Sequence, residues 1–449
     1  MKGATVNPSE SDSNMTMPGK EILLFQLGPV QDFIAQARST RDLWSGSYML
    51  SWLVAHAIHA ILETFNLQDE DIVMPSLANN PLILALRDPH ADVDLSKVLV
   101  PNLPNRILAI LPEGKGLEAG RLAQQAIRDE LARIGDSVWT WLENNVDANP
   151  AWRPAFDAQI KAFPQMAFAT VPWDGRPETW AAAHDALEAR LAARRNVRDF
   201  AQWPKAPFQK DSLSGKEEVI GNDAFWRRLR QNPLFNKAQN HRYGAINLLK
   251  RLWIKIPASD EQTADYLARS LNFSNAAIQR SLDVPSTQGI AKGNTDPKNP
   301  YLAVLAFDGD HMGEKISAQA DSADGIQRIS RTLSAFALDQ VPGIVERHHG
   351  YLIYAGGDDV LALLPSSRAV ACARAIERAF EAEGSAFGFT GSCGIAVGHK
   401  NTPLQMLVQK ARDMEHVAKD APSRGPYIAS MTVSNNPMRF SPSWRLMPV

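Results

Sequence analysis

The chain shows two similar alternations of apolar strands and amphipathic helices, separated by a mostly helical stretch. The first alternation opens with the apolar run EILLFQL from Glu21, closed by Gly28-Pro29, which predicts a buried strand. Apolar residues then recur three and four positions apart through a proline-free span, residues 30–67, as in a long helix. The later elements predicted in this unit are strands at 71–75, 81–86 and 105–112, a helix at 116–145 and a strand at 165–173. The alternation predicts a domain of mixed helix and sheet over residues 21–174.

The last alternation is the clearest. Its predicted elements are a strand at 301–307, a helix at 321–349, strands at 351–355 and 360–365, a helix at 368–383, a strand at 391–397 and a helix opened by Pro403. This βαββαβ order is that of a ferredoxin-like, or palm, domain. We place the domain at residues 301–440, followed by a tail at 441–449. Because the first unit has a comparable order, the chain is predicted to be an α+β protein with two diverged copies of one unit.

Residues 175–300 are predicted to form a helical middle domain, ending in a linker at 289–300 that is rich in Gly, Asn and Pro. Within it, the stretch 226–258 contains basic residues and no acidic ones. The basic residues are Arg227, Arg228, Arg230, Lys237, Arg242, Lys250, Arg251 and Lys255. A solvated helical face and a contact with RNA or a partner explain this run equally well.

Composition describes an ordinary folded protein. The 449 residues are 45% hydrophobic and 21% charged, which excludes wholesale disorder. The formal net charge of -2 provides no global positive field, so any nucleic acid is held locally or by partners. Two cysteines, Cys372 and Cys393, suit a reducing compartment, and we expect the cytoplasm. Residues 1–20 are polar and predicted to be disordered, and no run is long and apolar enough to predict a membrane span.

The candidate chemistry lies at Gly356-Gly357-Asp358-Asp359, between two apolar strands. Gly-Gly supplies the positive φ angles of a tight hairpin turn. Two adjacent carboxylates would repel each other unless a cation lay between them, so a divalent metal is expected. Because successive side chains on a strand point to opposite faces, we favour Asp358 as the ligand and Asp359 as an orienting group or second contact.

A partner carboxylate is expected from the first strand of the same unit, which ends in Asp308-Gly309-Asp310. That strand lies beside the third strand in a βαββαβ sheet, so Asp308 and the hairpin acids can converge. Mg²⁺ or Mn²⁺ held by carboxylates, the carbonyl of Gly309 and substrate phosphates would make a palm-type nucleotidyl transfer site. Gly309 and Asp310 are candidate nucleotide contacts as well.

Lys419, late in the last helix, could contact a triphosphate as a point charge. Lys410 and Arg412 are rivals for this role. All three are also explained as cations placed near the C-terminal end of a helix.

Seven segments, in order along the chain, resemble the large subunit of type III-B (Cmr-type) CRISPR RNA-guided effector complexes. The segments are LGPVQDFIAQARSTRDLWSGSYMLSWL (27–53), MPSLANNPL (74–82), LPNRILAILP (103–112), GAINLLKRLW (244–253), FDGDHMGEKIS (307–317), YAGGDDVLALLP (354–365) and SCGIAVGHKNTPL (392–404). The resemblance implies two palm domains related to nucleotide cyclases and polymerases. It implies polymerisation of ATP into 3'-5' cyclic oligoadenylate, activated by target RNA.

Carried onto this sequence, the resemblance makes Asp308, Asp358 and Asp359 catalytic and metal-binding, and Gly356 and Gly357 a nucleotide-lining turn. The partners it implies are small and backbone effector subunits, with guide and target RNA held mostly by those subunits. In the first palm, Leu27 stands where Asp308 stands in the second. That palm is expected to bind no metal and to complete the pocket for a second ATP.

The sequence departs from the family pattern in three places. About twenty polar residues precede the first palm, so we expect no HD nuclease domain and no cleavage of single-stranded DNA by this chain. The family's CxxC element is replaced by DSLSG at 211–215, so no zinc is expected. The chain ends soon after the second palm, so the sequence leaves open how this chain docks onto the other effector subunits. Two alternatives therefore stand beside the enzyme: a catalytically idle scaffold of the same complex, and a stand-alone nucleotide cyclase.

Overall fold

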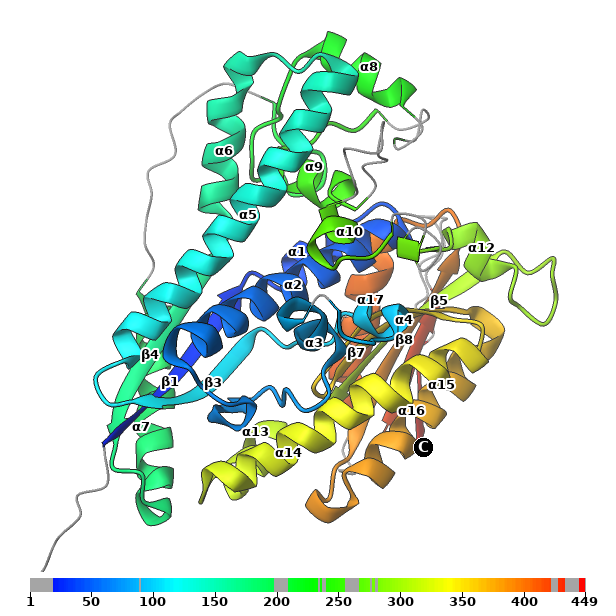
Figure 1. The fold of residues 1–449 in the computed structure, drawn as a ribbon. Helices are drawn as coiled ribbons and strands as arrows, with labels where there is room; N and C mark the ends of the chain where they lie inside the picture. The colour runs from blue at the N-terminus through cyan, green and yellow to red at the C-terminus, as the bar shows by residue number, and fades with distance from the viewer. Residues whose placement is uncertain are drawn as a thin grey trace, which may run out of the picture.

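The computed structural model consists of two sheet-based units with a helical lobe above them (Figure 1). It describes residues 19–88, 90–197, 209–232, 240–254, 266–274, 282–420, 427–432 and 444–448, together with 235, 277 and 278. The predicted disorder of residues 1–20 falls almost wholly outside these ranges.

The first unit is built on a four-stranded antiparallel sheet with the order β2-β3-β1-β4. Its strands are β1 (Lys20–Gly28), β2 (Ile72–Met74), β3 (Arg106–Pro112) and β4 (Gln165–Trp173). Alternate residues of β1 enter two different cores: Leu23 and Phe25 pack with helices α2 (Thr40–Phe65) and α5 (Gly116–Val146), and Ile22 and Leu24 pack with α7 (Pro177–Asn196). The short α1 (Gln31–Ala35) precedes α2.

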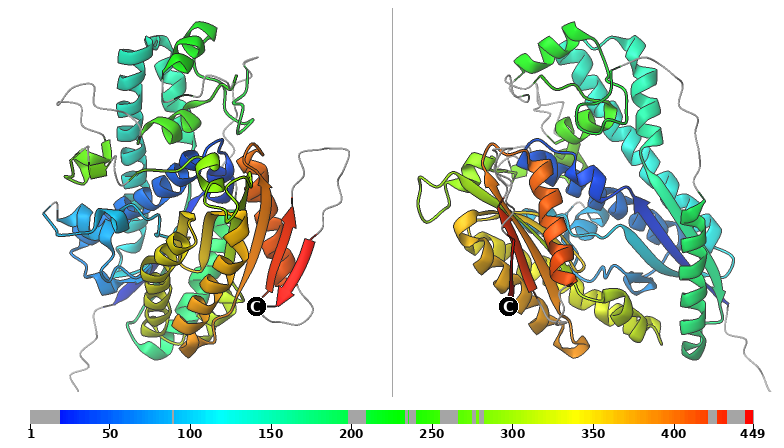
Figure 2. Two further views of the ribbon diagram at one scale, coloured as in Figure 1. Left: turned by 90° about the vertical axis from the view of Figure 1, so that its right-hand side faces the viewer. Right: turned by 180° about the vertical axis from the view of Figure 1, so that it is seen from behind.

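The second unit repeats this order and extends it, as β6-β7-β5-β8-β9-β10. Its strands are β5 (Tyr301–Gly309), β6 (Tyr351–Gly356), β7 (Asp359–Pro365), β8 (Gly391–His399), β9 (Tyr427–Thr432) and β10 (Trp444–Pro448). Helices α14 (Ala323–Ala335), α15 (Val341–Arg347) and α16 (Ala369–Glu383) cover one face, after the short α13 (Met312–Ala318). Helix α17 (Leu404–Lys419) covers the other face, as α7 does in the first unit (Figure 2). The shared order supports the predicted duplication.

The two units contact each other beside the β6–β7 hairpin of the second unit. Helix α2 packs against β6, and the Ala355 N–H donates to the carbonyl of Pro101 at 3.0 Å. Strand β2 packs against α14, where the Ser76 N–H donates to Ser330 Oγ at 2.7 Å. The candidate hairpin therefore lies at the junction between the units.

The middle region is helical, as predicted. Helices α8 (Asp223–Gln231) and α9 (Ala245–Leu252) pack on the upper half of α5 beside α6 (Arg153–Ala162), and α10 (Tyr266–Ser270) and α12 (Thr287–Ala291) lead to the second unit (Figure 1). Of the basic run, Lys250 and Arg251 are buried, so the solvated-face interpretation is wrong for them. Arg228 and Arg242 form ion pairs with Asp147 and Asp223, whereas Lys237 and Lys255 lie outside the described residues.

Three sequence predictions differ from the structure. The helix expected through residues 30–67 is interrupted by a turn at 36–39, between α1 and α2. Residues 81–86, predicted as a strand, form helix α3 (Pro81–Arg87), because Asn80 Oδ1 accepts from the N–H groups of Leu82 and Ile83 and proline occupies the first helical turn. The expected tail at 441–449 contains β10, which pairs with β9 and extends the second sheet. The remaining short helix is α4 (Leu95–Val98). No helix in the described part of the chain could span a membrane.

The DSLSG turn is organised by the buried carboxylate of Asp211. It accepts from the N–H groups of Leu213 at 2.7 Å, Ser214 at 2.9 Å and Gly244 at 2.6 Å, and from the side-chain amide of Asn247 at 3.1 Å. The carboxylate thus links the turn to the start of α9. These hydrogen bonds between residues of the chain are sufficient to explain the shape of the turn.

We expect Asp211→Ala to lower the free energy of unfolding by about 2–4 kcal/mol, because several buried donors lose their acceptor together. Urea unfolding measures the change. Asp223→Ala is the matched control, since it removes an exposed ion pair that contributes at most about 1 kcal/mol. Equal effects of the two substitutions would contradict the role given to Asp211.

Candidate active site

The strand end at Asp308 and the hairpin at Gly356-Gly357 meet at one edge of the second sheet. Strands β5 and β7 are antiparallel with Phe307 opposite Val360, and the Gly309 N–H donates to the carbonyl of Asp358 at 3.2 Å. Continued by one residue, this register places Asp308 opposite Asp359. Opposite residues share a face of a sheet, so the predicted carboxylates converge.

The sheet face of these carboxylates is the one that α17 covers. Ala306 on β5 and Leu361 on β7 pack in the same core as Ala411 of α17, whereas Phe307 and Val360 pack with α14–α16. Alternation along each strand then places Asp308 and Asp359 on the α17 side. The sequence favours Asp358 as the metal ligand, whereas the register makes Asp359 the direct cross-strand neighbour of Asp308.

Glycines make the close approach of the two segments possible. A Cβ on Gly309 would lie 2.6 Å from Met312 Cγ and 3.0 Å from Asp358 Cβ. Gly357 has a φ of +67° and open space around it. A side chain at Gly309 would therefore separate β5 from the hairpin, and the turn at Gly357 favours glycine.

Both hairpin carboxyls have raised pKa values. Burial, and next the charge of Asp308, raise the pKa of Asp358 to about 7. Burial raises the pKa of Asp359 to about 6, although the Arg412 guanidinium opposes the shift. The site thus concentrates negative charge that its own cations only partly offset, as expected for carboxylates that bind a metal ion.

Helix α17 contributes the cations. Lys419 Nζ contacts Asp308 Oδ2 and lies 3.3 Å from Glu415 Oε1, whereas Lys410 pairs with Asp413 at 2.7 Å. Of the three cations predicted as triphosphate contacts, Lys419 thus contacts the carboxylate cluster. The charge of Arg412 lowers the pKa of Asp359, and Lys410 pairs with Asp413 on the same helix. Sequence reasoning missed Glu415, although its i,i+4 spacing from Lys419 was the available signal.

Asp310 has different neighbours from Asp308. Its N–H donates to the carbonyl of Thr390 at 2.8 Å, and its charge acts on Lys315 and Glu377. Its Oδ1 is buried without a hydrogen-bond partner. Its predicted contact with a nucleotide stays a prediction.

These donors can hold a divalent ion only if the substrate contributes further ligands. No three His, Cys, Asp or Glu side chains in the described part of the chain are arranged to hold a metal ion by themselves. The donors that meet at the hairpin are hard oxygen ligands, which suit Mg²⁺ or Mn²⁺ completed by phosphates. The residues present fit a metal that arrives with a nucleotide.

The two hairpin carboxyls are expected to destabilise the metal-free protein increasingly as the pH rises. The pKa values of Asp358 and Asp359 are about 7 and about 6 when folded, against an ordinary value of 3.8. Between these limits both carboxyls retain protons in the folded chain that they have released in the unfolded chain, so their contribution to the free energy of unfolding falls as the pH rises from about 4 to 7.

Urea unfolding at several pH values in EDTA tests this dependence. The double variant Asp358→Asn, Asp359→Asn should show a flatter pH profile and higher stability at pH 7. Superimposable profiles for the two proteins would contradict the raised pKa values.

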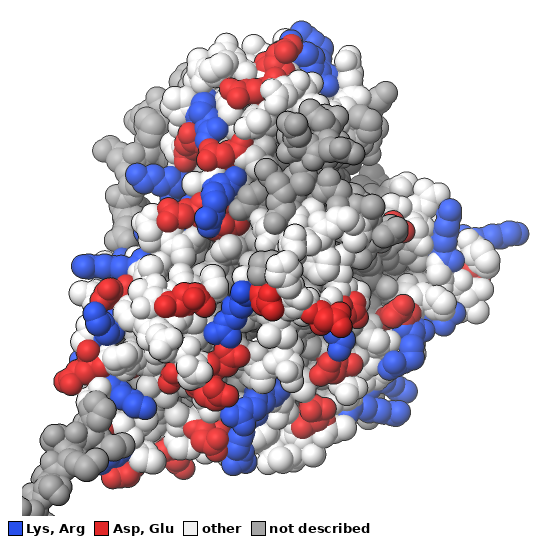
Figure 3. All heavy atoms as spheres, viewed as in Figure 1, with Lys and Arg blue, Asp and Glu red and all other residues white. Residues whose placement is uncertain are grey.

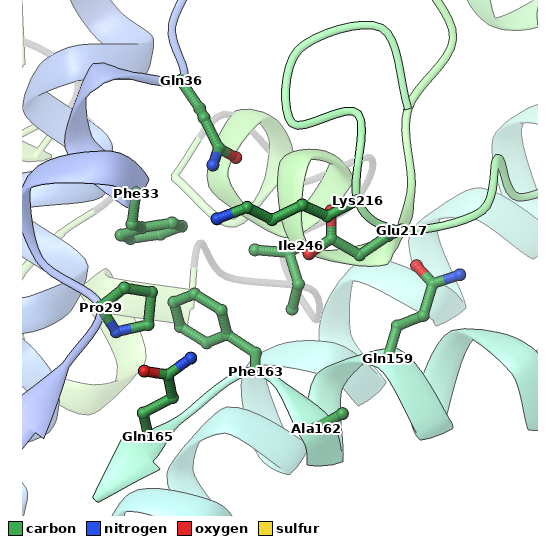
Figure 4. A pocket seen from close by; sticks show the side chains of 10 residues that line it. All are labelled: Pro29, Phe33, Gln36, Gln159, Ala162, Phe163, Gln165, Lys216, Glu217 and Ile246. Atoms are coloured by element: carbon green, nitrogen blue, oxygen red, sulfur yellow. The ribbon is translucent and has the colours of Figure 1, made fainter. Parts of the chain in front are cut away.

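The first unit has an apolar counterpart of this strand end. Leu27 is fully buried, and its N–H donates to the carbonyl of Asn105 at 2.9 Å. Beyond it, a cavity of about 210 Å³ opens between Pro29, Phe33 and Phe163 on one side and Lys216 and Glu217 on the other (Figure 4). This cavity includes none of the predicted carboxylates.

Two βαββαβ sheets, one carrying carboxylates at a Gly-Gly hairpin, define a protein with two palm-type domains. Two family models match it: CRISPR-associated protein Cmr2, N-terminal, over residues 22–136, and Cas10/Cmr2, second palm domain, over residues 301–427. Together these matches cover more than half of the chain, which therefore belongs to the Cas10/Cmr2 family of Cmr-type large subunits.

Known proteins are similar to this chain in sequence or in fold. The CRISPR system Cmr subunit Cmr2 of Pyrococcus furiosus is 24% identical, in a match covering 92% of this chain and 61% of that protein. A chain of the type III-B Cmr-beta complex bound to cognate target RNA is similar in fold, with a TM-score of 0.68, 13% identity and coverage of 96% and 71%. A chain of the Csm1-Csm4 cassette in complex with cA4 has a TM-score of 0.53, 14% identity and coverage of 92% and 54%.

Proposed function

We propose that this chain is a subunit of a type III-B CRISPR effector complex and converts ATP into 3'-5' cyclic oligoadenylate when target RNA binds. The observation that carries the proposal is the convergence of Asp308, Asp358 and Asp359 beside Lys419. Solved structures of similar fold support the proposal, because they include complexes with cognate target RNA, with cA4 and with one ATP.

In this proposal, Mg²⁺ or Mn²⁺ would be held at the end of β5 by the carboxylates of Asp308, Asp358 and Asp359 and by the carbonyl of Gly309. The bound ion would lower the pKa of the attacking hydroxyl and neutralise the triphosphate. Lys419, already at Asp308, is placed to move its ammonium onto a phosphate oxygen. Gly357 leaves space for a nucleotide at the turn.

Guide and target RNA are held mostly by other effector subunits in this proposal. On the face shown in Figure 3, basic and acidic side chains are interspersed, in line with the net charge of -2. A mixed surface of this kind gives little non-specific attraction for a polyanion. Recognition of RNA by this chain would then be local.

The test is reconstitution of the chain with its neighbouring effector subunits and guide RNA. The complex is incubated with ATP and Mg²⁺ or Mn²⁺, with and without complementary RNA, and the products are identified by mass spectrometry. Cyclic oligoadenylate that forms only with target RNA supports the proposal. An assembled, target-bound complex that makes no product would favour the scaffold, and product made by the chain alone would favour the stand-alone cyclase.

A further inference from the structure

Helix α17 lies close against strand β8, because two glycines of the strand face it. A Cβ on Gly394 would collide with the backbone of Ala411 and Glu415. A Cβ on Gly398 would lie 2.6 Å from Leu407 Cδ2. Because a helix in such close contact with a sheet has little freedom to slide or turn, these contacts fix the position of the second half of α17.

The order of the contacts shows where α17 ends. The helix runs back along β8, towards the first residue of that strand. On β8, Ser392 is the neighbour of Asp308 in the antiparallel register, and it precedes Gly394 by two residues. Lys419, one turn beyond Glu415, therefore reaches Asp308, which its ammonium contacts.

Glu415 is a buried carboxylate whose charge is balanced mainly by Lys419. The residue is 5% exposed. Its Oε1 lies 3.3 Å from Lys419 Nζ and makes no aligned hydrogen bond within the described ranges of the chain. His416 Nδ1 is farther away, at 3.9 Å, and the side chain of His416 is 73% exposed. The carboxylate thus has an ammonium beside it and an acceptor site that is not yet used.

An ordinary pair on a helix surface does not account for the burial of Glu415. Glu and Lys four residues apart support a helix when both are solvated, because water compensates a charge that is left unpaired. Here the carboxylate is removed from water, which is costly unless its partner is held close. The cost has a reason if Glu415 keeps the ammonium of Lys419 in one place.

The ammonium of Lys419 lies between two carboxylates. It contacts Asp308 at the end of β5 and Glu415 on its own helix. In the proposed function, Asp308 contributes to holding a metal ion and Lys419 turns towards a phosphate oxygen, so the contact between the two is given up. Glu415 is then the carboxylate that stays beside the ammonium.

We propose that Glu415 is a positioning residue, which holds the ammonium of Lys419 at the phosphates of the nucleotide. The inference rests on the proposed function. In this role Glu415 acts through Lys419 and touches neither the nucleotide nor the metal ion. A lysine that is held in advance loses less conformational freedom when the nucleotide binds, so Glu415 contributes to affinity.

The direction of the expected effect separates this role from simple electrostatics. Glu415 is a negative charge near a site for a polyanion, so its charge by itself repels a nucleotide. On that ground alone, removing the charge should tighten binding. Loss of the positioning contact should weaken binding instead, so the sign of the change distinguishes the two.

The test measures the affinity of the full chain for a nonhydrolysable ATP analogue with Mg²⁺, by calorimetry. Glu415→Gln keeps the shape of the side chain and should weaken binding about threefold to tenfold, as expected when one long side chain is no longer held in advance. Lys419→Met should weaken binding about tenfold or more, through loss of a charge-assisted contact. In the Lys419→Met background, Glu415→Gln should cause no further weakening, because Glu415 acts through Lys419.

Matched variants separate positioning from general effects. Asp413→Asn removes an equal charge from an ion pair on the same helix and should leave the affinity unchanged. Glu415→Asp keeps the charge with a shorter reach and should retain part of the affinity. In the reconstituted complex, Glu415→Gln should raise the KM for ATP with a smaller change in kcat. A general structural defect would instead lower the melting temperature.

Each outcome decides the proposal. Weaker binding by Glu415→Gln that disappears in the Lys419→Met background supports it. Unchanged or tighter binding by Glu415→Gln, with binding by Lys419→Met weakened, would overturn the role of Glu415 and leave the proposed function standing. Equal weakening with and without Lys419 would overturn it too, because the effect would not pass through the lysine. A wild-type chain that binds no analogue would contradict the proposed function itself, and the role of Glu415 with it.

Discussion

ATP polymerisation is expected to fall about a thousandfold or more when Asp358 and Asp359 are both replaced by alanine in the reconstituted complex. The two substitutions remove the hairpin carboxylates that face the end of β5, leaving Asp308 paired with Lys419. Metal ions typically contribute several kcal/mol to stabilising a transition state, and ~4 kcal/mol corresponds to a thousandfold in rate.

Assembly should survive these substitutions. Both residues lie at a turn, and their burial as charges destabilises the metal-free chain, so alanine should not unfold it. Product formation by mass spectrometry and complex size by gel filtration are measured together. Asp413→Ala, which breaks a surface pair with Lys410 on α17, is the control and should retain activity. Full activity of the double variant in an intact complex would show that the hairpin is not the catalytic site.

The largest loss of stability is expected from Arg251→Met, at about 3–5 kcal/mol. Arg251 and Asp42 form an ion pair whose side chains are 8% and 4% exposed. Removing one partner leaves the other as an uncompensated buried charge, and this accounts for the size of the effect. Urea unfolding provides the measurement, with the surface variant Arg331→Met expected to change stability by less than ~0.5 kcal/mol.

A second substitution distinguishes the buried charge from lost packing. Asp42→Asn in the Arg251→Met background removes the orphaned charge, while the amide oxygen can still accept from the N–H groups at the start of α2. Stability should be partly recovered. A double variant that is less stable than Arg251→Met alone would show that the charge is not the source of the loss.

The sequence predicted the sheets well because their signals are local. Apolar runs ended by Gly-Pro or Gly-Gly gave β1 and the β6–β7 hairpin, and strand order then followed from the βαββαβ rule. The run at 81–86 was misassigned because six apolar residues fit a strand or a buried helix equally well. The capping by Asn80 decided the outcome.

The sequence predicted that the carboxylates lie together, but it did not predict how they face one another. Adjacent acids after Gly-Gly identified Asp358 and Asp359, but which of them faces Asp308 depends on the register of β5 and β7. The burial of Lys250 has no signature in one sequence, because a charged residue on a helix is usually solvated. The spacing of Glu415 from Lys419 predicts a pair on one helix but does not show that this pair lies beside Asp308. Only the tertiary contacts reveal that α9 is enclosed.

The two sheets have the same strand order, yet one central strand ends in Leu27 and the other in Asp308. Such asymmetry between copies amounts to a division of labour within one polypeptide. Under the proposed function, the copy with the carboxylates would be constrained by chemistry, whereas the other would be constrained by the shape it presents to its neighbour. Substitutions near Leu27 would then be selected for fit, and those near Asp308 for charge, so the two halves would diverge at different positions from one ancestral unit.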